Sequence, residues 1–150
     1  MYKRILVPTD GSKTSALALQ EACKLAAGSE ARLRIVHVID SPYAYADTWY
    51  AAMSVDADTV QRAWRSAGQE VLNQAAAQVR QAGVGVETAL LETDGRRVSR
   101  VIVDDAEQWP AEVIVIGSHG RQGLEQLLIG SVAEGVARSA RVPVLLVRAK

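Results

Sequence analysis

The sequence predicts a doubly wound α/β domain, in which helices cover both faces of a five-stranded parallel β-sheet. Five short stretches rich in Val, Ile and Leu follow one another along the chain, separated by segments with helical spacing of apolar residues. Such alternation is typical of βαβ units with right-handed crossovers. With 150 residues the chain has the usual size of one domain, so we expect a single domain over residues 1–150.

The predicted strands are apolar runs more than alternating patterns, as expected for strands that are buried on both faces of a parallel sheet. They lie at RILVP (4–8), RLRIVHVI (32–39), VGVETALL (84–91), EVIVIG (112–117) and VPVLLV (142–147). No internal repeat or low-complexity linker separates them, so the sequence gives no sign of a domain boundary.

Four segments between these strands are predicted helices. Residues 12–27 and 57–82 place apolar side chains three and four positions apart, and the second of these stripes contains Val60, Trp64, Ala67, Val71, Ala75, Val79 and Ala82. Gly28 and Gly83 then mark the ends of the two helices. Shorter helices are expected at 96–108 and 131–140, where Ser131 and Glu134 have the spacing of a capping box.

The composition excludes several classes of partner. Lys and Arg together number 17, as do Asp and Glu, so no overall field favours nucleic acid or an anionic membrane. The apolar runs are too short to cross a membrane and the first residues lack a signal-peptide pattern, which makes the cytoplasm the expected location. One cysteine and two histidines are too few for a disulfide or a transition-metal site, whereas Mg²⁺ held mainly by a ligand's phosphates is compatible.

The least regular segment covers residues 40–56 and holds Trp49 and three of the four tyrosines. We interpret it first as a surface loop whose aromatic side chains lie over the core. A lid over a ligand and a dimer contact are the alternatives.

Residues 117–131, GSHGRQGLEQLLIGS, place four glycines between the fourth strand and the last helix. Ligands of open α/β sheets bind beyond the carboxyl ends of the strands, where the strand order reverses. If the first strand is central and the fourth lies beside it, residues 8–12 and 117–131 meet at that point. Glycine lets a phosphate approach the backbone, and a helix N-terminus attracts an anion. The pattern therefore predicts a phosphate-binding loop, although a glycine-rich turn before a helix also occurs where nothing binds.

The spacing differs from the better-known nucleotide-binding loops. The G-x-G-x-x-G pattern would require glycine at position 119, which is histidine, and no G-x-x-x-x-G-K-[ST] occurs. A dinucleotide-binding Rossmann protein and a P-loop NTPase are both disfavoured.

The glycines read G-x2-G-x9-G-S, a motif that resembles the ATP-binding branch of the universal stress protein family. The resemblance extends along the chain through KRILVPTDGS, IVHVID, VIVIGSHG and RVPVLLVR. It implies the strand order 3-2-1-4-5 and a homodimer that pairs the fifth strands, here residues 142–147.

The same resemblance implies a set of residues that bind ATP. Asp10 contacts the ribose or the phosphate-bound Mg²⁺, Pro8 and Thr9 shape the pocket floor, and Val38 meets adenine through its backbone. The motif residues are Gly117 on the ribose side and, on the phosphates, Gly120, Gly130, Ser131 and Val132, mostly through backbone N–H groups. Two further candidates are open: Arg121 reaches a terminal phosphate or is solvated, and His119 is a general base or a solvent-facing loop residue.

The function implied is an adenine-nucleotide-binding regulatory module of the stress response, which holds ATP and Mg²⁺ and changes its dimer or partner contacts with occupancy. One alternative is a slow ATP hydrolase, against which the sequence shows no Walker lysine and no evident water-orienting residue beyond Asp10 and His119. The other is a structural dimer without nucleotide, against which the intact glycine motif counts.

Overall fold

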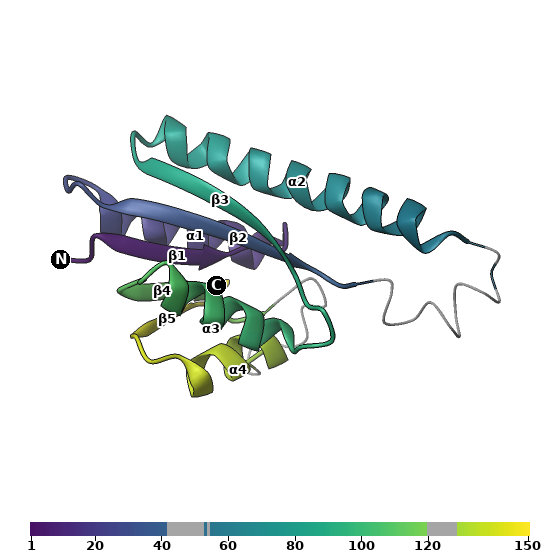
Figure 1. Ribbon diagram of the computed structural model, residues 1–150. Coiled ribbons are helices and arrows are strands. Elements are labelled where there is room, and N and C mark those ends of the chain that lie inside the picture. Colours follow the sequence, from purple (N-terminus) through teal and green to yellow (C-terminus); the bar gives the residue numbers. More distant parts are fainter. Residues whose placement is uncertain (42–52, 54, 120–128) are drawn as a thin grey trace.

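A computed structural model of the chain describes residues 1–41, 53, 55–119 and 129–150 (Figure 1). Its strands, β1 (Arg4–Pro8), β2 (Arg32–Ile39), β3 (Gly85–Glu92), β4 (Val113–Gly117) and β5 (Val144–Val147), form one parallel sheet. The strand order is β3-β2-β1-β4-β5, which confirms the predicted fold class and order. The chain runs from β1 outward to β3 and then returns to β4 beside β1, so the strand order reverses between β1 and β4.

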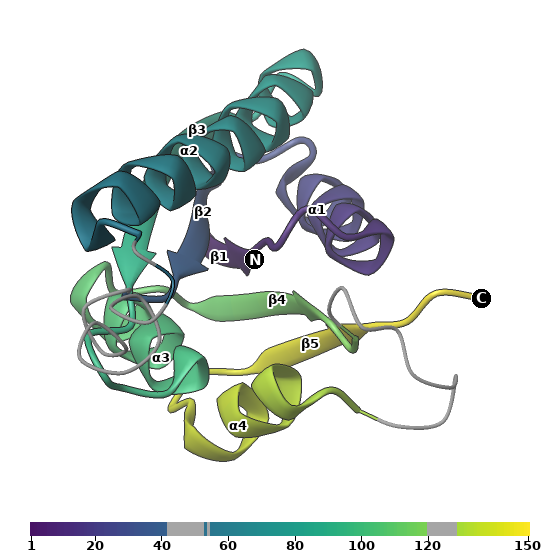
Figure 2. The ribbon, with the colours of Figure 1, turned by 90° about the vertical axis from the view of Figure 1, so that its right-hand side faces the viewer.

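The helices form two layers, one on each face of the sheet. Figure 2 shows α1 (Lys13–Ala26) and α2 (Ala57–Gln81) on one side and α3 (Val98–Gln108) and α4 (Ser131–Ser139) on the other. Because side chains alternate along a strand, Ile5 and Val7 pack with α1 and α2, whereas Leu6 packs with α3 and α4. None of the helices in the described part of the chain combines the length and apolar composition that a bilayer crossing requires.

The ends of the two longer helices follow from local chemistry. Ser12 begins α1, because its side chain accepts a hydrogen bond from the amide of Ser15 at 3.2 Å, and Asp56 caps α2 in the same way. Gly28 and Gly83 follow the helix ends with φ of +71° and +74°. This left-handed conformation suits glycine, so the predicted stops are confirmed.

The predicted apolar stripe of α2 is wrong at two positions. Ala67 and Ala82 are exposed, whereas Gly68 and Leu72 face the sheet. A Cβ at position 68 would lie only 2.8 Å from Cδ1 of Leu90, so the glycine allows α2 to approach the sheet closely. Stripe counting misses such a position because glycine has no apolar side chain.

A cluster of charged side chains fastens α3 to β2 and β3. The guanidinium of Arg34 on β2 donates to both oxygens of Asp105 on α3, at 2.8 and 2.9 Å, and to Glu87 on β3 at 3.1 Å. Trp109 donates from Nε1 to the same Glu87 at 2.6 Å. The hydrogen bond to Asp105 raises the pKa of Arg34 above its ordinary value, so the cluster contains a permanent positive charge.

Candidate functional site

Three segments meet where β1 and β4 end. The two strands pair in parallel, so their carboxyl ends lie at the same edge of the sheet. Gly117, the last residue of β4, packs on the first turn of α1, where a Cβ would lie 2.8 Å from Cγ2 of Thr14. The amide of Gly130 donates to the carbonyl oxygen of Ser118 at 2.6 Å, which brings the start of α4 to the same place. The structure thus joins the loop after β1, the end of β4 and the start of α4.

The loop after β1 is held by its own hydrogen bonds. The Thr9 amide donates to the carbonyl of Val36 at 2.8 Å, and the Asp10 carboxylate accepts from the Ser12 amide at 2.9 Å. Gly11 has a φ of +79°, a conformation that glycine adopts without steric cost. These contacts hold the Asp10 carboxylate beyond the end of β1.

The neighbouring strand brings two further predicted residues to this edge. Pro8 ends β1 opposite Val36, and Val38 lies two residues further along β2, partly buried on the α3–α4 face. The ring of His37 points to the other face, and its Nδ1 lies 2.7 Å from the Thr9 carbonyl oxygen. His37 therefore contacts the backbone of the loop after β1.

The start of α4 differs from the predicted capping box. Gly130, not Ser131, is the N-cap, and no side chain in the described part of the chain bonds to this helix start. Glu134 pairs instead with Arg138 at 2.8 Å. The Gly130 amide, expected to bind phosphate, is occupied by Ser118, whereas the amides of Ser131 and Val132 begin the helix and have no intrahelical acceptor. They carry the positive end of the helix dipole.

Ser118 and His119 form a partly buried polar pair beside this helix start. Ser118 is fully buried, its amide donates to the Val147 carbonyl at 2.8 Å, and its Oγ lies 2.9 Å from Nδ1 of His119. The Nε2 atom of His119 is buried and has no hydrogen-bond partner among the residues described. This nitrogen therefore does not face solvent, although His119 as a whole is only partly buried. Ser118 was not among the predicted residues, because a small residue beside a glycine carries no distinctive sequence signal.

Other predictions fall outside the described residues. These include the roles of Gly120 and Arg121 and the interpretation of residues 40–56, of which 42–52 and 54 are not described. Within the described ranges, no three His, Cys, Asp or Glu side chains gather as metal ligands.

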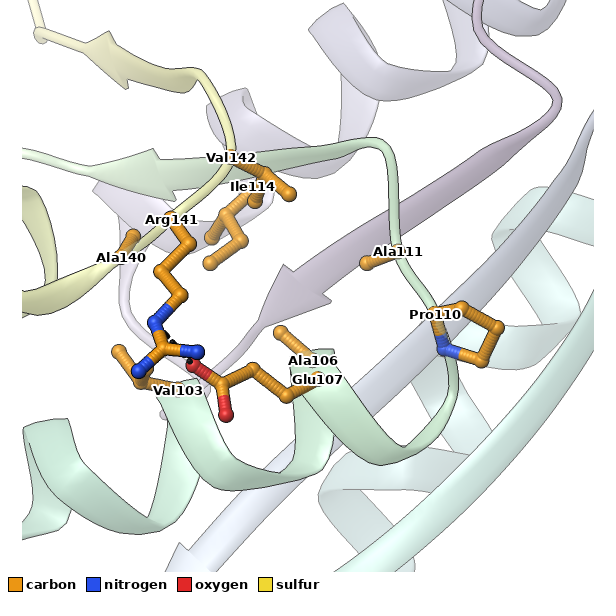
Figure 3. Close-up of a pocket in the computed structure, with 9 residues that line it drawn as sticks. All are labelled: Val103, Ala106, Glu107, Pro110, Ala111, Ile114, Ala140, Arg141 and Val142. Carbon is orange, nitrogen blue, oxygen red and sulfur yellow. Dashed lines mark ion pairs between the residues drawn. The ribbon is translucent and has the colours of Figure 1, made fainter.

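A cavity of about 270 Å³ lies at the amino ends of the strands, opposite the candidate site (Figure 3). Val103, Ile114 and Val142 contribute apolar lining, and Arg141 and Glu107 form an ion pair of 3.5 Å beside it. Its lining includes residues just before β5 and near the beginning of β4, so it lies at the amino ends of these strands. None of the predicted site residues lines this cavity.

Comparison with protein families and relatives gives a consistent result. The model of the universal stress protein family matches residues 1–148. Universal stress protein MJ0531 of Methanocaldococcus jannaschii is 34% identical, over 99% of this chain and 83% of its own length. Universal stress protein YxiE of Bacillus subtilis is 30% identical, over 99% of this chain and 100% of its own length.

Solved structures share the fold. MJ0577 of M. jannaschii is 26% identical with a TM-score of 0.84, covering 100% of this chain and 98% of that one. A universal stress protein in complex with cAMP has a TM-score of 0.66, at 26% identity over 98% of this chain and 97% of that one. The Archaeoglobus fulgidus universal stress protein in complex with dAMP has a TM-score of 0.69, at 26% identity over 98% of both chains. With its fold, its family match and these relatives, the chain belongs to the universal stress protein family.

Proposed function

We propose that this chain binds ATP with Mg²⁺ where β1 and β4 end, and acts as a homodimeric regulatory module of the stress response. The observation that carries the proposal is the start of α4. Within the described residues its N-cap has no side-chain hydrogen bond, and it adjoins the partly buried Ser118–His119 pair at the reversal of strand order. Relatives solved with cAMP and dAMP support an adenine nucleotide as the ligand class.

The phosphates lie at the start of α4 in this proposal. The backbone amides of Ser131 and Val132 donate to phosphate oxygens, and the helix dipole favours the negative charge. Gly130 acts through its bond to Ser118, which holds the helix start against the end of β4. Gly120 and Arg121, outside the described residues, complete the phosphate contacts.

The nucleoside lies across the neighbouring strand ends. Asp10 contacts the ribose or the metal, Pro8 and Thr9 form the floor, and Val38 meets adenine through its backbone. Gly117 lies on the ribose side, in addition to its packing against α1.

A single carboxylate suits the proposed metal. Mg²⁺ is usually held by one or two carboxylates together with the phosphates and water, not by an all-protein cage. Asp10, fixed by the Ser12 amide, is positioned to supply such an oxygen. The ion, when bound, neutralises phosphate charge.

Binding, not hydrolysis, is the activity that the described residues favour. A general base needs a ring nitrogen with an available lone pair and a group that orients the ring. In His119 the Ser118 hydroxyl engages Nδ1 at 2.9 Å, and no described carboxylate bonds to Nε2. Slow hydrolysis is the alternative outcome of ligand analysis.

The homodimer is proposed to form through β5. This strand lies at one edge of the sheet, pairs only with β4 among the described strands, and exposes 40% of Leu145. Pairing of two β5 strands covers an apolar edge that would otherwise invite unspecific association. Leu145→Lys should therefore yield a monomer in sedimentation experiments, and an unchanged dimer would exclude this interface.

The nucleotide proposal is tested by removing one backbone donor while the helix is kept. Ser131→Pro deletes the first amide of α4 at the helical position where proline is best tolerated, and Gly130 already has a ψ of 154°, which suits a following proline. Ser131→Ala is the matched control, since it deletes the hydroxyl and keeps the amide. Loss of a charge-assisted bond should weaken ATP binding of Ser131→Pro by about tenfold in calorimetry. A wild type that does not bind ATP, or equal affinity in both variants, would contradict the proposal.

A further inference from the structure

We propose that His119 donates a hydrogen bond from Nε2 to a phosphate oxygen of the bound nucleotide, and that Ser118 holds the ring in the required tautomer. The inference rests on the proposed nucleotide site. It adds a side-chain donor to a phosphate site otherwise built from backbone, and it states which nitrogen of the ring carries the proton.

The tautomer follows from the surroundings of Ser118. This residue is 0% exposed, and its amide and carbonyl are engaged by Val147 and Gly130. Among the described residues, Nδ1 of His119 is the atom that its hydroxyl meets, at 2.9 Å. A neutral imidazole has one donor and one acceptor nitrogen, and a buried hydroxyl hydrogen without an acceptor is costly. Both demands are met when Ser118 donates to Nδ1, which places the ring proton on Nε2.

The Nε2–H group is then a buried donor that lacks an acceptor. No described residue bonds to Nε2, and leaving such a group unpaired disfavours the ligand-free state. His119 directly follows Ser118, whose carbonyl oxygen holds the N-cap of α4 at 2.6 Å. A ligand oxygen at this helix start would satisfy the donor, and the helix dipole favours an oxygen that carries negative charge. Phosphate has both properties.

The same tautomer excludes two other roles for His119. A metal ligand or a general base needs an available lone pair, and here the lone pair belongs to Nδ1, which Ser118 occupies. His119 would therefore bind phosphate without coordinating the metal or accepting a proton from water.

The tautomer can be read directly by NMR, because the chain has two histidines. His37 is an internal control: its Nδ1 lies 2.7 Å from the Thr9 carbonyl oxygen, which can only accept, so its proton must be on Nδ1. Long-range ¹H–¹⁵N spectra of ¹⁵N-histidine-labelled protein should show opposite tautomers, with the signals assigned by His119→Gln. In Ser118→Ala the Nδ1 resonance of His119 should shift, because this lone pair loses the hydrogen bond from the Ser118 hydroxyl.

Two substitutions of His119 test which ring nitrogen contributes to ATP affinity. The amide of His119→Gln reaches the place of Nε2 and should bind ATP nearly as the wild type does. His119→Asn imitates Nδ1 and should bind about tenfold more weakly, the cost of a charge-assisted bond. Thermal unfolding of both variants controls for folding.

Three results would overturn the inference. An Nδ1–H tautomer of His119 in the wild type removes the assigned donor. Unchanged ATP affinity in His119→Asn, while the wild type binds ATP, removes this contact and leaves the proposed function standing. A wild type that does not bind ATP overturns both proposals.

Discussion

Two glycines lie where an added methyl group would collide with a neighbouring helix, but the atoms that it would meet differ. A Cβ at Gly117 would lie 2.8 Å from Cγ2 of Thr14 and 3.0 Å from both its carbonyl carbon and oxygen. A Cβ at Gly135 on α4 would lie 2.5 Å from Oγ and 2.7 Å from Cβ of Ser99 on α3. The first collision involves backbone and the second only a side chain. We therefore expect that shortening Ser99 rescues the stability lost in Gly135→Ala, whereas shortening Thr14 does not rescue Gly117→Ala.

The size of each effect follows from packing and propensity. Overpacking of a dense core costs about 1–3 kcal/mol, and alanine gains about 0.5–1 kcal/mol over glycine within a strand. Gly117→Ala should thus lower the free energy of unfolding by about 1–2 kcal/mol, or about 2–8 °C in Tm for a chain of this length. Thr14→Ala should restore little, because the backbone atoms remain. Ser99→Gly should relieve Gly135→Ala completely, and alanine then gains about 1 kcal/mol in helix propensity.

Denaturant unfolding of the two double-mutant cycles measures this difference. We expect a large favourable coupling energy between positions 99 and 135, and a small one between 14 and 117. Full stability of Gly117→Ala, or its complete rescue by Thr14→Ala, would refute the close approach of α1 to β4. The result also bears on function, because reduced nucleotide binding by an unstable Gly117→Ala cannot be assigned to a lost ligand contact.

Three further predictions concern charge and ionisation. Asp105→Asn should lower the free energy of unfolding by roughly 3 kcal/mol, because it removes the carboxylate that pairs with the mostly buried Arg34. As a control, Arg100→Ala, which breaks an exposed ion pair, should cost no more than about 0.5 kcal/mol. Equal losses would contradict a buried Arg34–Asp105 pair. Burial raises the pKa of the Cys23 thiol above 9.0, so we expect iodoacetamide to modify it more slowly in the folded than in the urea-unfolded chain, and equal rates would show an exposed thiol. The backbone amide of Lys3, at 2.6 Å, lowers the pKa of Glu112 below 4.5, so the ionised carboxylate stabilises the fold above its unfolded-state pKa and this stabilisation is lost as pH falls through the folded-state value. Glu112→Gln should accordingly be less stable than the wild type at neutral pH, with a gap that closes in acid; a gap independent of pH would contradict this origin.

The strands and their order could be predicted because their signals are strong. A strand buried on both faces is mostly apolar, and all five predicted runs are strands within two residues of their expected bounds. The order came from the family resemblance. The boundary of α3 shifted by two residues: the helix begins at Val98, with Arg97 as its N-cap and no side-chain hydrogen bond at that position.

The charged cluster of Arg34, Asp105 and Glu87 could not be predicted from the sequence, for a physical reason. Arg34 interrupts an apolar strand, and Asp105 continues the stripe of Val98, Val101 and Ile102 on α3. Each charge alone suggests an exposed position. They can be buried only because β2, β3 and α3 bring opposite charges together, and this register is not visible in any one segment.

The meeting of the β1 and β4 ends with the start of α4 could be predicted, but the hydrogen bonds there could not. The motif located the start of α4 at the end of β4, because glycine spacing reflects backbone geometry. It could not show that the Gly130 amide bonds to Ser118, or that Ser118 engages one nitrogen of His119. Those assignments depend on which polar atoms are buried together.

The most direct test of the account identifies what the protein carries. Freshly purified protein should be denatured in acid and the released small molecules measured by mass spectrometry. A second, native sample should be titrated with ATP. We expect ATP near one molecule per chain, retained without hydrolysis. ADP in its place would favour the hydrolase, and a protein that is empty and also fails to bind added ATP would contradict the nucleotide site.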